Sequence, residues 1–221
     1  MIEAVIFDMD GILINSEPFW KRAEQKCFLT VGLELNDELC KQTTGLDGIG
    51  TITYWYQHKP WKGLSFAEMK KRIEYEVMDQ VMQNGKANNG VDMILELFKS
   101  KQIKTAVASS SPLFLIETVL KKLNLTQSFA VWQTSETEEA GKPHPAVYIA
   151  TAKRLNVKPG NCLAFEDSIN GLKSAKSAGM KVVVVPDPHL KGDLRYNEAD
   201  LIIDSLDQFS EDHLRSLNRL N

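Results

Sequence analysis

Apolar residues follow two different spacings along this chain, and the spacing changes near residues 15 and 90. Between those positions apolar side chains recur at roughly helical intervals, and no segment has a convincing strand pattern. Elsewhere, short runs of consecutive apolar residues alternate with segments of helical spacing. Strands that alternate with helices are typical of a parallel, doubly wound sheet. We therefore predict an α/β core, residues 1–14 and 90–221, interrupted by a small α-helical cap domain, residues 15–89.

The individual elements follow from the same pattern. Helices of the insert are predicted at residues 19–29, 37–42, 49–58 and 65–82, with Ser16 as an N-cap and a capping box of Ser65 and Glu68. Core strands are predicted at residues 4–7, 105–108, 130–133, 162–165, 181–185 and 201–203. Core helices are predicted at residues 91–100, 113–123, 145–155 and 168–178. An insert directly after the first strand can exclude water from a site at the sheet edge and choose substrates.

Two acidic residues come directly after the first predicted strand. Asp8 and Asp10 are two positions apart, and side chains two apart in an extended chain project to the same side. They stand at the carboxyl end of the strand, where open α/β sheets bind their ligands. Two neighbouring carboxylates repel each other, so the pair favours a cation or a phosphate group nearby. Taken alone, an ordinary turn that exposes both acids to solvent explains the pair equally well.

Three further polar features follow predicted strands or lie in the loops between them. Ser109 follows the second strand, Lys142 lies in a loop, and Glu166 and Asp167 follow the fourth strand. This set suits a Mg²⁺-assisted phosphoryl transfer, because Asp8 and Asp167 can supply oxygen ligands to Mg²⁺. Lys142 and the Ser109 hydroxyl can hold the phosphoryl oxygens. One carboxylate can then act as nucleophile while a second moves the proton.

Each of these residues also has a plain structural explanation. Ser109 can be a turn or cap residue, since the run Ser109–Pro112 suits a helix start. Lys142 can be an exposed loop lysine. Glu166 and Asp167 can be acids that stabilise the N-terminus of the helix that follows them. No single residue of this set therefore identifies a function, and only the order of the residues along the chain can.

Composition excludes several classes of protein. The formal net charge of -3 provides no basic surface for a nucleic acid. The three cysteines, Cys27, Cys40 and Cys162, lack the spacing of a zinc site or a disulfide framework and indicate a reducing compartment. No apolar run approaches the ~20 residues that span a bilayer, and no secretory signal precedes the first strand. We expect a cytoplasmic monomer that binds neither nucleic acid nor membrane.

The ordered motifs resemble those of a known family. They match the four motifs of the haloacid dehalogenase superfamily in the correct order, and they span the whole chain: Asp8-x-Asp10-Gly11, Ser109, Lys142-Pro143 and Glu166-Asp167. The resemblance implies a Rossmann-like core and a small-molecule phosphate ester as substrate. Dehalogenases of the superfamily lack the second acid of the first motif, so Asp10 favours phosphate esters.

The resemblance also implies a role for each motif residue. Asp8 would be the phosphorylated nucleophile and Asp10 the general acid and base. Glu166 would support Lys142 or the metal. Mg²⁺ would be bound by the carboxylates of Asp8 and Asp167 and by the main-chain carbonyl of Asp10. The phosphoryl group would be bound by Ser109, Ser110 and Lys142.

Within the superfamily, the helical insert resembles the cap of the β-phosphoglucomutase and phosphatase subgroup, and the motif segments look most similar to the bacterial hexitol phosphatases, also called 2-deoxyglucose-6-phosphate phosphatases. β-Phosphoglucomutases carry a histidine at the position of Trp20, where it couples cap closure to Asp10, so Trp20 favours hydrolysis. The loop after Gly45 usually carries a basic residue, whereas this chain has Asp47, which would repel a second phosphate. We assign Trp20, Gly45 and Asp47 to substrate binding.

These observations predict a Mg²⁺-dependent phosphomonoesterase that acts on a small sugar or polyol phosphate through an aspartyl-phosphate. A phosphosugar mutase of the β-phosphoglucomutase type is the first alternative. A regulatory protein that binds a sugar phosphate without turnover is the second.

Overall fold

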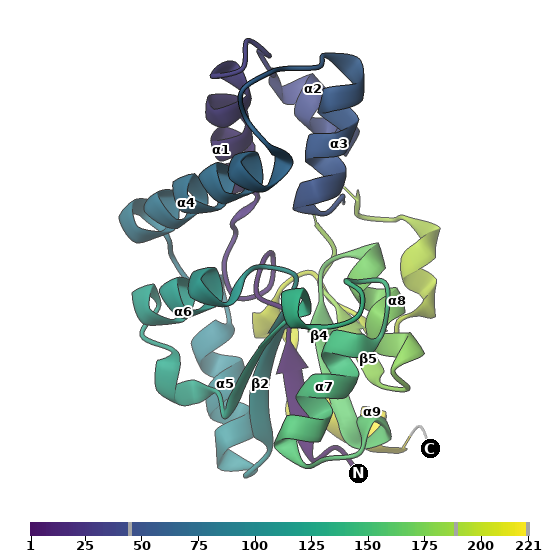
Figure 1. The fold of residues 1–221 in the computed structure, drawn as a ribbon. Coiled ribbons are helices and arrows are strands. Elements are labelled where there is room, and N and C mark those ends of the chain that lie inside the picture. Colours follow the sequence, from purple (N-terminus) through teal and green to yellow (C-terminus); the bar gives the residue numbers. More distant parts are fainter. Residues whose placement is uncertain (44–45, 188–189, 220–221) are drawn as a thin grey trace. The chain divides into compact units, whose positions relative to one another are not determined.

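The computed structural model describes residues 1–43, 46–187 and 190–219 and divides the chain into two compact units (Figure 1). We call Met1–Asn15 with Lys86–Asn221 the core unit and Ser16–Gly85 the helical unit. Backbone and side-chain contacts tie the end of the core unit's first segment to the start of its second. Ile14 forms an antiparallel bridge with Ala87, and the Asn88 side chain donates to the carbonyls of Gly11 at 2.8 Å and Ile12 at 3.0 Å.

The core unit contains one six-stranded sheet in which every neighbouring pair is parallel. Its strand order is β3-β2-β1-β4-β5-β6, which is the order of a doubly wound fold and confirms that prediction. The strands are β1 Ala4–Phe7, β2 Lys104–Ser109, β3 Val131–Thr134, β4 Cys162–Glu166, β5 Lys181–Val184 and β6 Leu201–Ile202. In register, Phe7 lies between Val107 of β2 and Phe165 of β4.

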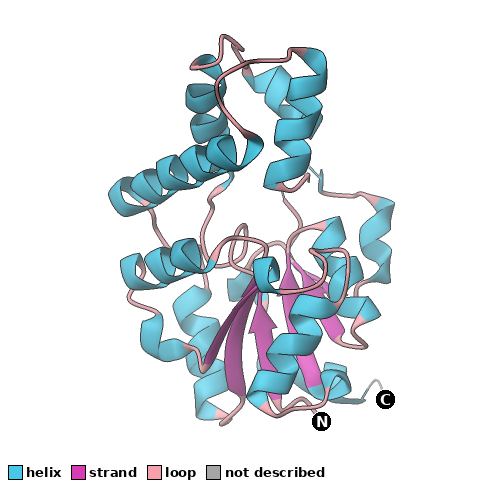
Figure 2. Cartoon of the chain, viewed as in Figure 1, coloured by secondary structure: helices cyan, strands magenta, loops and turns pink. Residues whose placement is uncertain are grey.

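Helices cover both faces of this sheet (Figure 2). They are α5 Val91–Ser100, α6 Leu113–Lys122, α7 Ala146–Leu155, α8 Ile169–Ser177 and α9 Glu211–Arg219. Because successive side chains of a strand point to opposite faces, Ile6 packs in one cluster with α7 and α8, whereas Phe7 stacks on Phe165 at 5.0 Å and meets Phe98 of α5 at 6.1 Å. Burial on both faces explains the continuous apolar runs of the central strands.

The helical unit is built from α1 Glu17–Leu29, α2 Asp37–Cys40, α3 Gly48–His58 and α4 Phe66–Asn84. The capping box of Ser65 and Glu68 at the start of α4 forms as predicted. Ser16 takes the N-cap position of α1, but its side chain makes no capping hydrogen bond, because its backbone is already helical. Short 3₁₀ turns of the described residues lie at Lys41–Thr43, Thr126–Ser128, Ser135–Thr137, Pro159–Asn161, Leu194–Glu198 and Leu206–Gln208.

The element boundaries agree with the sequence pattern to within a few residues. The largest difference is α9, because no helix was predicted at Glu211–Arg219. A smaller one is at residues 37–42, where an α-helix of four residues gives way to a 3₁₀ turn. Among the described residues, no helix combines the length and apolar character that crossing a membrane requires.

Candidate active site

The candidate site lies at the carboxyl edge of the core unit's sheet. Asp8 directly follows β1, and its N–H donates to the Phe165 carbonyl of β4 at 2.9 Å, which continues the ladder by one residue. Ser109 is the last residue of β2 and Glu166 the last of β4. Since β1, β2 and β4 are parallel neighbours, their ends meet at one edge.

Lys142 is bound at the centre of this edge. Its Nζ donates to Asp8 Oδ1 at 2.8 Å, to Glu166 Oε1 at 2.6 Å and to the Ala108 carbonyl at 3.1 Å. An ammonium has three hydrogens to donate, so all three are used. The side chain is only 6% exposed. Lys142 is therefore not an exposed loop lysine, and it links three neighbouring strand ends with one buried charge.

Glu166 is fully buried, and both of its oxygens are occupied. Besides the ion pair with Lys142, Oε1 accepts the Tyr148 hydroxyl at 2.6 Å. Oε2 accepts the N–H of Asp167 at 3.2 Å and the Ser168 hydroxyl at 3.2 Å. A buried carboxylate is tolerated only when it is paired and hydrogen-bonded. These bonds indicate that Glu166 holds Lys142 in place.

Two glycines leave room for the acids. A Cβ on Gly171, in α8, would lie 2.0 Å from a Glu166 carboxylate oxygen. A Cβ on Gly11 would lie 1.9 Å from Asp167 Oδ2, and Gly11 also has a φ of +78°, which favours glycine. The carboxylates of Glu166 and Asp167 therefore fit closely against the backbone of two other segments.

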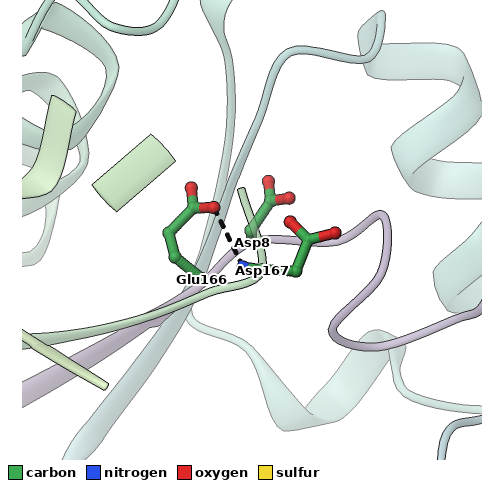
Figure 3. A group of neighbouring side chains, drawn as sticks. All are labelled: Asp8, Glu166 and Asp167. Atoms are coloured by element: carbon green, nitrogen blue, oxygen red, sulfur yellow. Dashed lines mark hydrogen bonds between the residues drawn. The ribbon is translucent and has the colours of Figure 1, made fainter. Parts of the chain in front are cut away.

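Asp8, Glu166 and Asp167 form a cluster whose candidate ligand atoms lie within 4.8 Å of one another. Figure 3 shows the three carboxyl groups pointing in the same direction from the strand ends, with the dashed bond from the Asp167 N–H to Glu166. Within the part of the chain that the structure describes, the Asp167 carboxylate accepts no hydrogen bond and forms no ion pair. A hard oxygen-ligated cation such as Mg²⁺ fits this donor set.

Burial sets the acid–base character of the cluster. It raises the pKa of Asp8 to about 7, with Glu166 and Asp10 adding to the rise and Lys142 opposing it. Burial also raises the pKa of Asp167 well above its ordinary value, and the neighbouring Asp8 and Glu166 charges add to this. For Lys142 burial acts against the charge, yet the two acids outweigh it and raise its pKa. Lys142 thus stays charged, while the acids favour a second cation.

Asp10 is held by the loop after β2. Its Oδ2 accepts the Ser111 hydroxyl at 2.7 Å and, at a longer 3.4 Å, the Ser109 hydroxyl. Ser109 does not cap α6, because the N-cap residue of that helix is Pro112. The explanation of Ser109 as a helix cap is therefore wrong. Ser110, between the two bonded serines, is exposed.

The three substrate-binding residues assigned to the insert belong to the helical unit or lie outside the described residues. Trp20 is partly buried in α1. Asp47 is the N-cap of α3, and its Oδ1 accepts the Gly50 N–H at 2.6 Å. Gly45 lies outside the described residues. The acid in this loop thus has a structural use as a helix cap.

Sequence reasoning missed four residues that support the site. Tyr148 binds Glu166, Tyr196 donates to the Asp167 carbonyl at 2.6 Å, Asn88 holds the backbone after Asp10, and Ser111 binds Asp10. Tyr196 and Asn88 lie far from the motifs in sequence, and Tyr148, six residues after Lys142, carries no local signal. Ser111 alone had one, because it follows Ser109 by two positions.

Comparisons with known proteins agree with this geometry. The family model described as "Haloacid dehalogenase-like hydrolase" matches residues 5–185. Hexitol phosphatase B of Escherichia coli (strain K12) is 37% identical over 95% of this chain and 95% of its own. The phosphorylated carbohydrates phosphatase of Thermotoga maritima is 34% identical over 81% of this chain and 83% of its own. The crystal structure of CbbY from Rhodobacter sphaeroides in complex with phosphate superposes with a TM-score of 0.86 at 25% identity, covering 94% of this chain and 96% of that one.

Proposed function

The chain belongs to the haloacid dehalogenase-like hydrolase family, and we propose that it is a Mg²⁺-dependent phosphatase that hydrolyses a small sugar or polyol phosphate through a phosphorylated Asp8. The single observation that carries the proposal is Lys142, whose buried ammonium binds both Asp8 and Glu166. A protein that only bound a ligand would need no carboxylate oriented in this way beside a second acid. Family membership agrees with the resemblance that the four motifs predict.

Asp8 is the proposed nucleophile. Its carboxylate lies at the end of the central strand and is oriented by the ion pair with Lys142 at 2.8 Å. The same cation favours the ionised, nucleophilic form and offsets charge on the phosphoryl oxygens. Attack of an Asp8 oxygen on phosphorus forms an acyl phosphate and releases the sugar or polyol oxygen. One difficult hydrolysis thereby becomes two easier steps.

The proposed metal ligands are the carboxylates of Asp8 and Asp167 and the main-chain carbonyl of Asp10. When bound there, Mg²⁺ supplies positive charge for the phosphoryl oxygens. The raised pKa values of Asp8 and Asp167 describe acids that a cation would stabilise in the ionised form. Glu166 is assigned to Lys142 instead, because both of its oxygens are occupied.

Asp10 is the proposed general acid and base. It is two residues from Asp8, and Ser109 and Ser111 hold its carboxyl group. In the first step Asp10 gives its proton to the leaving oxygen. In the second step the same group, now ionised, takes a proton from the water that attacks the phosphorylated Asp8. Ser109, Ser110 and Lys142 are the proposed binders of the phosphoryl group.

A sugar or polyol is the proposed leaving group, since two of the relatives are named as phosphatases of hexitols and of phosphorylated carbohydrates. Trp20, Gly45 and Asp47 are the proposed substrate residues of the helical unit, which we propose to act as a cap. The absence of a histidine at position 20 favours hydrolysis over a mutase cycle. The protein is proposed to be a cytoplasmic monomer.

The test is phosphate release from a panel of hexose, hexitol and triose phosphates, with Mg²⁺ and with a chelator, followed by identification of the products. Mg²⁺-dependent release from hexose or hexitol phosphates is the expected result. Isomerised hexose phosphate without free phosphate would replace the proposal with a mutase. Tight binding across the panel without turnover would replace it with a sugar-phosphate-binding protein.

A further inference from the structure

Ser111 makes a short hydrogen bond to Asp10, the proposed acid and base. Its Oγ lies 2.7 Å from Asp10 Oδ2, compared with 3.4 Å for Ser109 Oγ. The Ser111 side chain is buried, with 4% exposure. A distance of 2.7 Å is the ordinary length of a well-formed O–H···O hydrogen bond.

The backbone of Ser111 is held on both sides. Its N–H donates to Ser109 Oγ at 3.0 Å, and its carbonyl accepts the Thr134 hydroxyl, at the end of β3, at 2.8 Å. The Ser111 hydroxyl is not used to cap α6, whose N-cap residue Pro112 follows it. Ser111 is therefore fixed by two strand ends, and its hydroxyl is directed to Asp10.

The two serines are suited to different tasks. Ser109 Oγ already accepts the Ser111 N–H, and its hydrogen reaches Asp10 only at the longer distance. When a phosphoryl group binds, the Ser109 hydroxyl can turn toward it and leave Asp10. The Ser111 hydroxyl then keeps the Asp10 carboxyl group in place, because nothing in the proposed chemistry requires it elsewhere.

We propose that Ser111 is a positioning residue that aligns Asp10 for proton transfer. This inference rests on the proposed function. In the first step the Asp8–phosphorus bond forms, the bond from phosphorus to the leaving oxygen breaks, and that oxygen takes the Asp10 proton. In the second step a water oxygen bonds to phosphorus, the Asp8–phosphorus bond breaks, and Asp10 takes the proton from the water. Ser111 keeps its own proton throughout and acts by orienting Asp10.

The choice of leaving group distinguishes a positioning role of Ser111 from a merely structural one. A sugar or polyol alkoxide needs a proton to leave, whereas 4-nitrophenolate leaves without one. The ratio kcat/KM reports events up to the first irreversible step, which is the step that releases the leaving group. If Asp10 is no longer aligned, kcat/KM should therefore fall for the sugar or polyol phosphate and not for 4-nitrophenyl phosphate.

The experiment compares Ser111→Ala with wild type on a hexitol phosphate and on 4-nitrophenyl phosphate, both with Mg²⁺. We expect kcat/KM to fall about 10- to 100-fold for the hexitol phosphate, within the range of general acid catalysis. For 4-nitrophenyl phosphate we expect a change of less than about 3-fold, since no proton is needed. Ser111→Thr retains the hydroxyl and should restore most of the loss. Ser100→Ala, at an exposed site on α5, is the matched control.

A double-mutant cycle sharpens the result. In an Asp10→Asn background, Ser111→Ala should cause little further loss on the hexitol phosphate, because the two residues act as one unit. An equal loss on both esters, no loss on either, or a Ser111→Thr variant as impaired as Ser111→Ala would each overturn the inference while leaving the proposed function intact. Wild-type protein that hydrolyses neither ester would instead overturn the proposed function, and the inference with it.

Discussion

Glu166 of the core unit is fully buried and Glu24 of the helical unit is half-buried, and the surroundings of the two carboxyl groups are opposite. Glu166 ends β4 and is bound by Lys142, Tyr148 and groups of the next two residues. Glu24 lies in α1, and within the described ranges it forms neither a hydrogen bond nor an ion pair. Burial alone raises the pKa of Glu24 to about 7.

The difference lies in how the two sites compensate a carboxyl charge. At the sheet edge, burial is offset by a fixed cation and by donors, so several acids can be kept close together for chemistry. In α1 burial is not offset, and the carboxyl group shifts toward its neutral form instead. A perturbed pKa is therefore not enough to identify a functional acid. The hydrogen-bond and ion-pair partners of the carboxyl group distinguish a functional acid from one that is only buried.

The largest expected effect comes from Asp8→Asn, which removes the proposed nucleophile and leaves Glu166 and Lys142 paired. Turnover should fall by about 10⁴-fold or more, as when other covalent nucleophiles are removed. The free energy of unfolding should change little, because the substitution removes one of several neighbouring negative charges. Phosphate release and urea unfolding measure the two quantities. Normal turnover in this variant would exclude Asp8 as the nucleophile.

Lys142→Gln would leave the buried Glu166 carboxyl group without a cation, and in this respect it would then resemble Glu24. Loss of one partner from a buried ion pair typically costs about 3–5 kcal/mol of unfolding free energy. Lys41→Gln is the matched control, because its partner Glu38 is 78% exposed and such pairs contribute about 0–1 kcal/mol. Equal urea midpoints for the two variants would contradict the role assigned to Lys142. Turnover of Lys142→Gln should also be lost, since the phosphoryl oxygens lose their cation.

Gly171→Ala tests the space around Glu166 without changing any charge. The new Cβ would meet the Glu166 carboxylate, which has to move and weaken its bonds to Lys142 and Tyr148. Overpacking of this kind costs about 1–3 kcal/mol, and the better helix propensity of alanine recovers part of it. Gly48→Ala, in α3, is the control, because its nearest contact is an ordinary 3.7 Å. If both alanine variants are equally stable and the first is fully active, Glu166 is less constrained than its bonds indicate.

Glu24→Gln should have the smallest effect and the opposite sign. The folded pKa of about 7 lies above the ordinary 4.5, so the folded state binds the extra proton and stability falls as pH rises between about 4.5 and about 7. The neutral amide of glutamine does not ionise, so the variant does not lose this stability as pH rises. We expect Glu24→Gln to be more stable than wild type by about 1–2 kcal/mol at pH 8 and nearly equal to it at pH 4. Thermal unfolding at the two pH values measures this, and the same difference at both would show that Glu24 is not the titrating group.

Much of the fold could be predicted from the sequence because the central strands are buried on both faces. Runs such as residues 182–185 are continuous and apolar, and they end at a proline or a polar residue. The four-residue helix α2 was less well predicted, because two turns of weak periodicity do not distinguish an α-helix from a 3₁₀ turn.

The site could be predicted as far as its residues follow strand ends. Asp8, Ser109 and Glu166 are placed by the parallel sheet, which brings strand ends together whatever their separation in sequence. Tyr148 could not be predicted, because it lies on the buried side of α7 among apolar residues and only the packing of α7 on the sheet directs its hydroxyl to Glu166. Ser111 was missed although it follows Ser109 by two positions, because that spacing does not say which serine of the run binds Asp10.

The most direct test of the account is a rapid-mixing experiment on Asp10→Asn with Mg²⁺ and 4-nitrophenyl phosphate. Formation of the Asp8 acyl phosphate needs no proton for this leaving group, whereas its hydrolysis needs Asp10 as the base. The account predicts a burst of one 4-nitrophenolate per active site followed by slow release, and no burst when Asp8→Asn is added. Steady release without a burst, or a burst that survives the loss of Asp8, would contradict it.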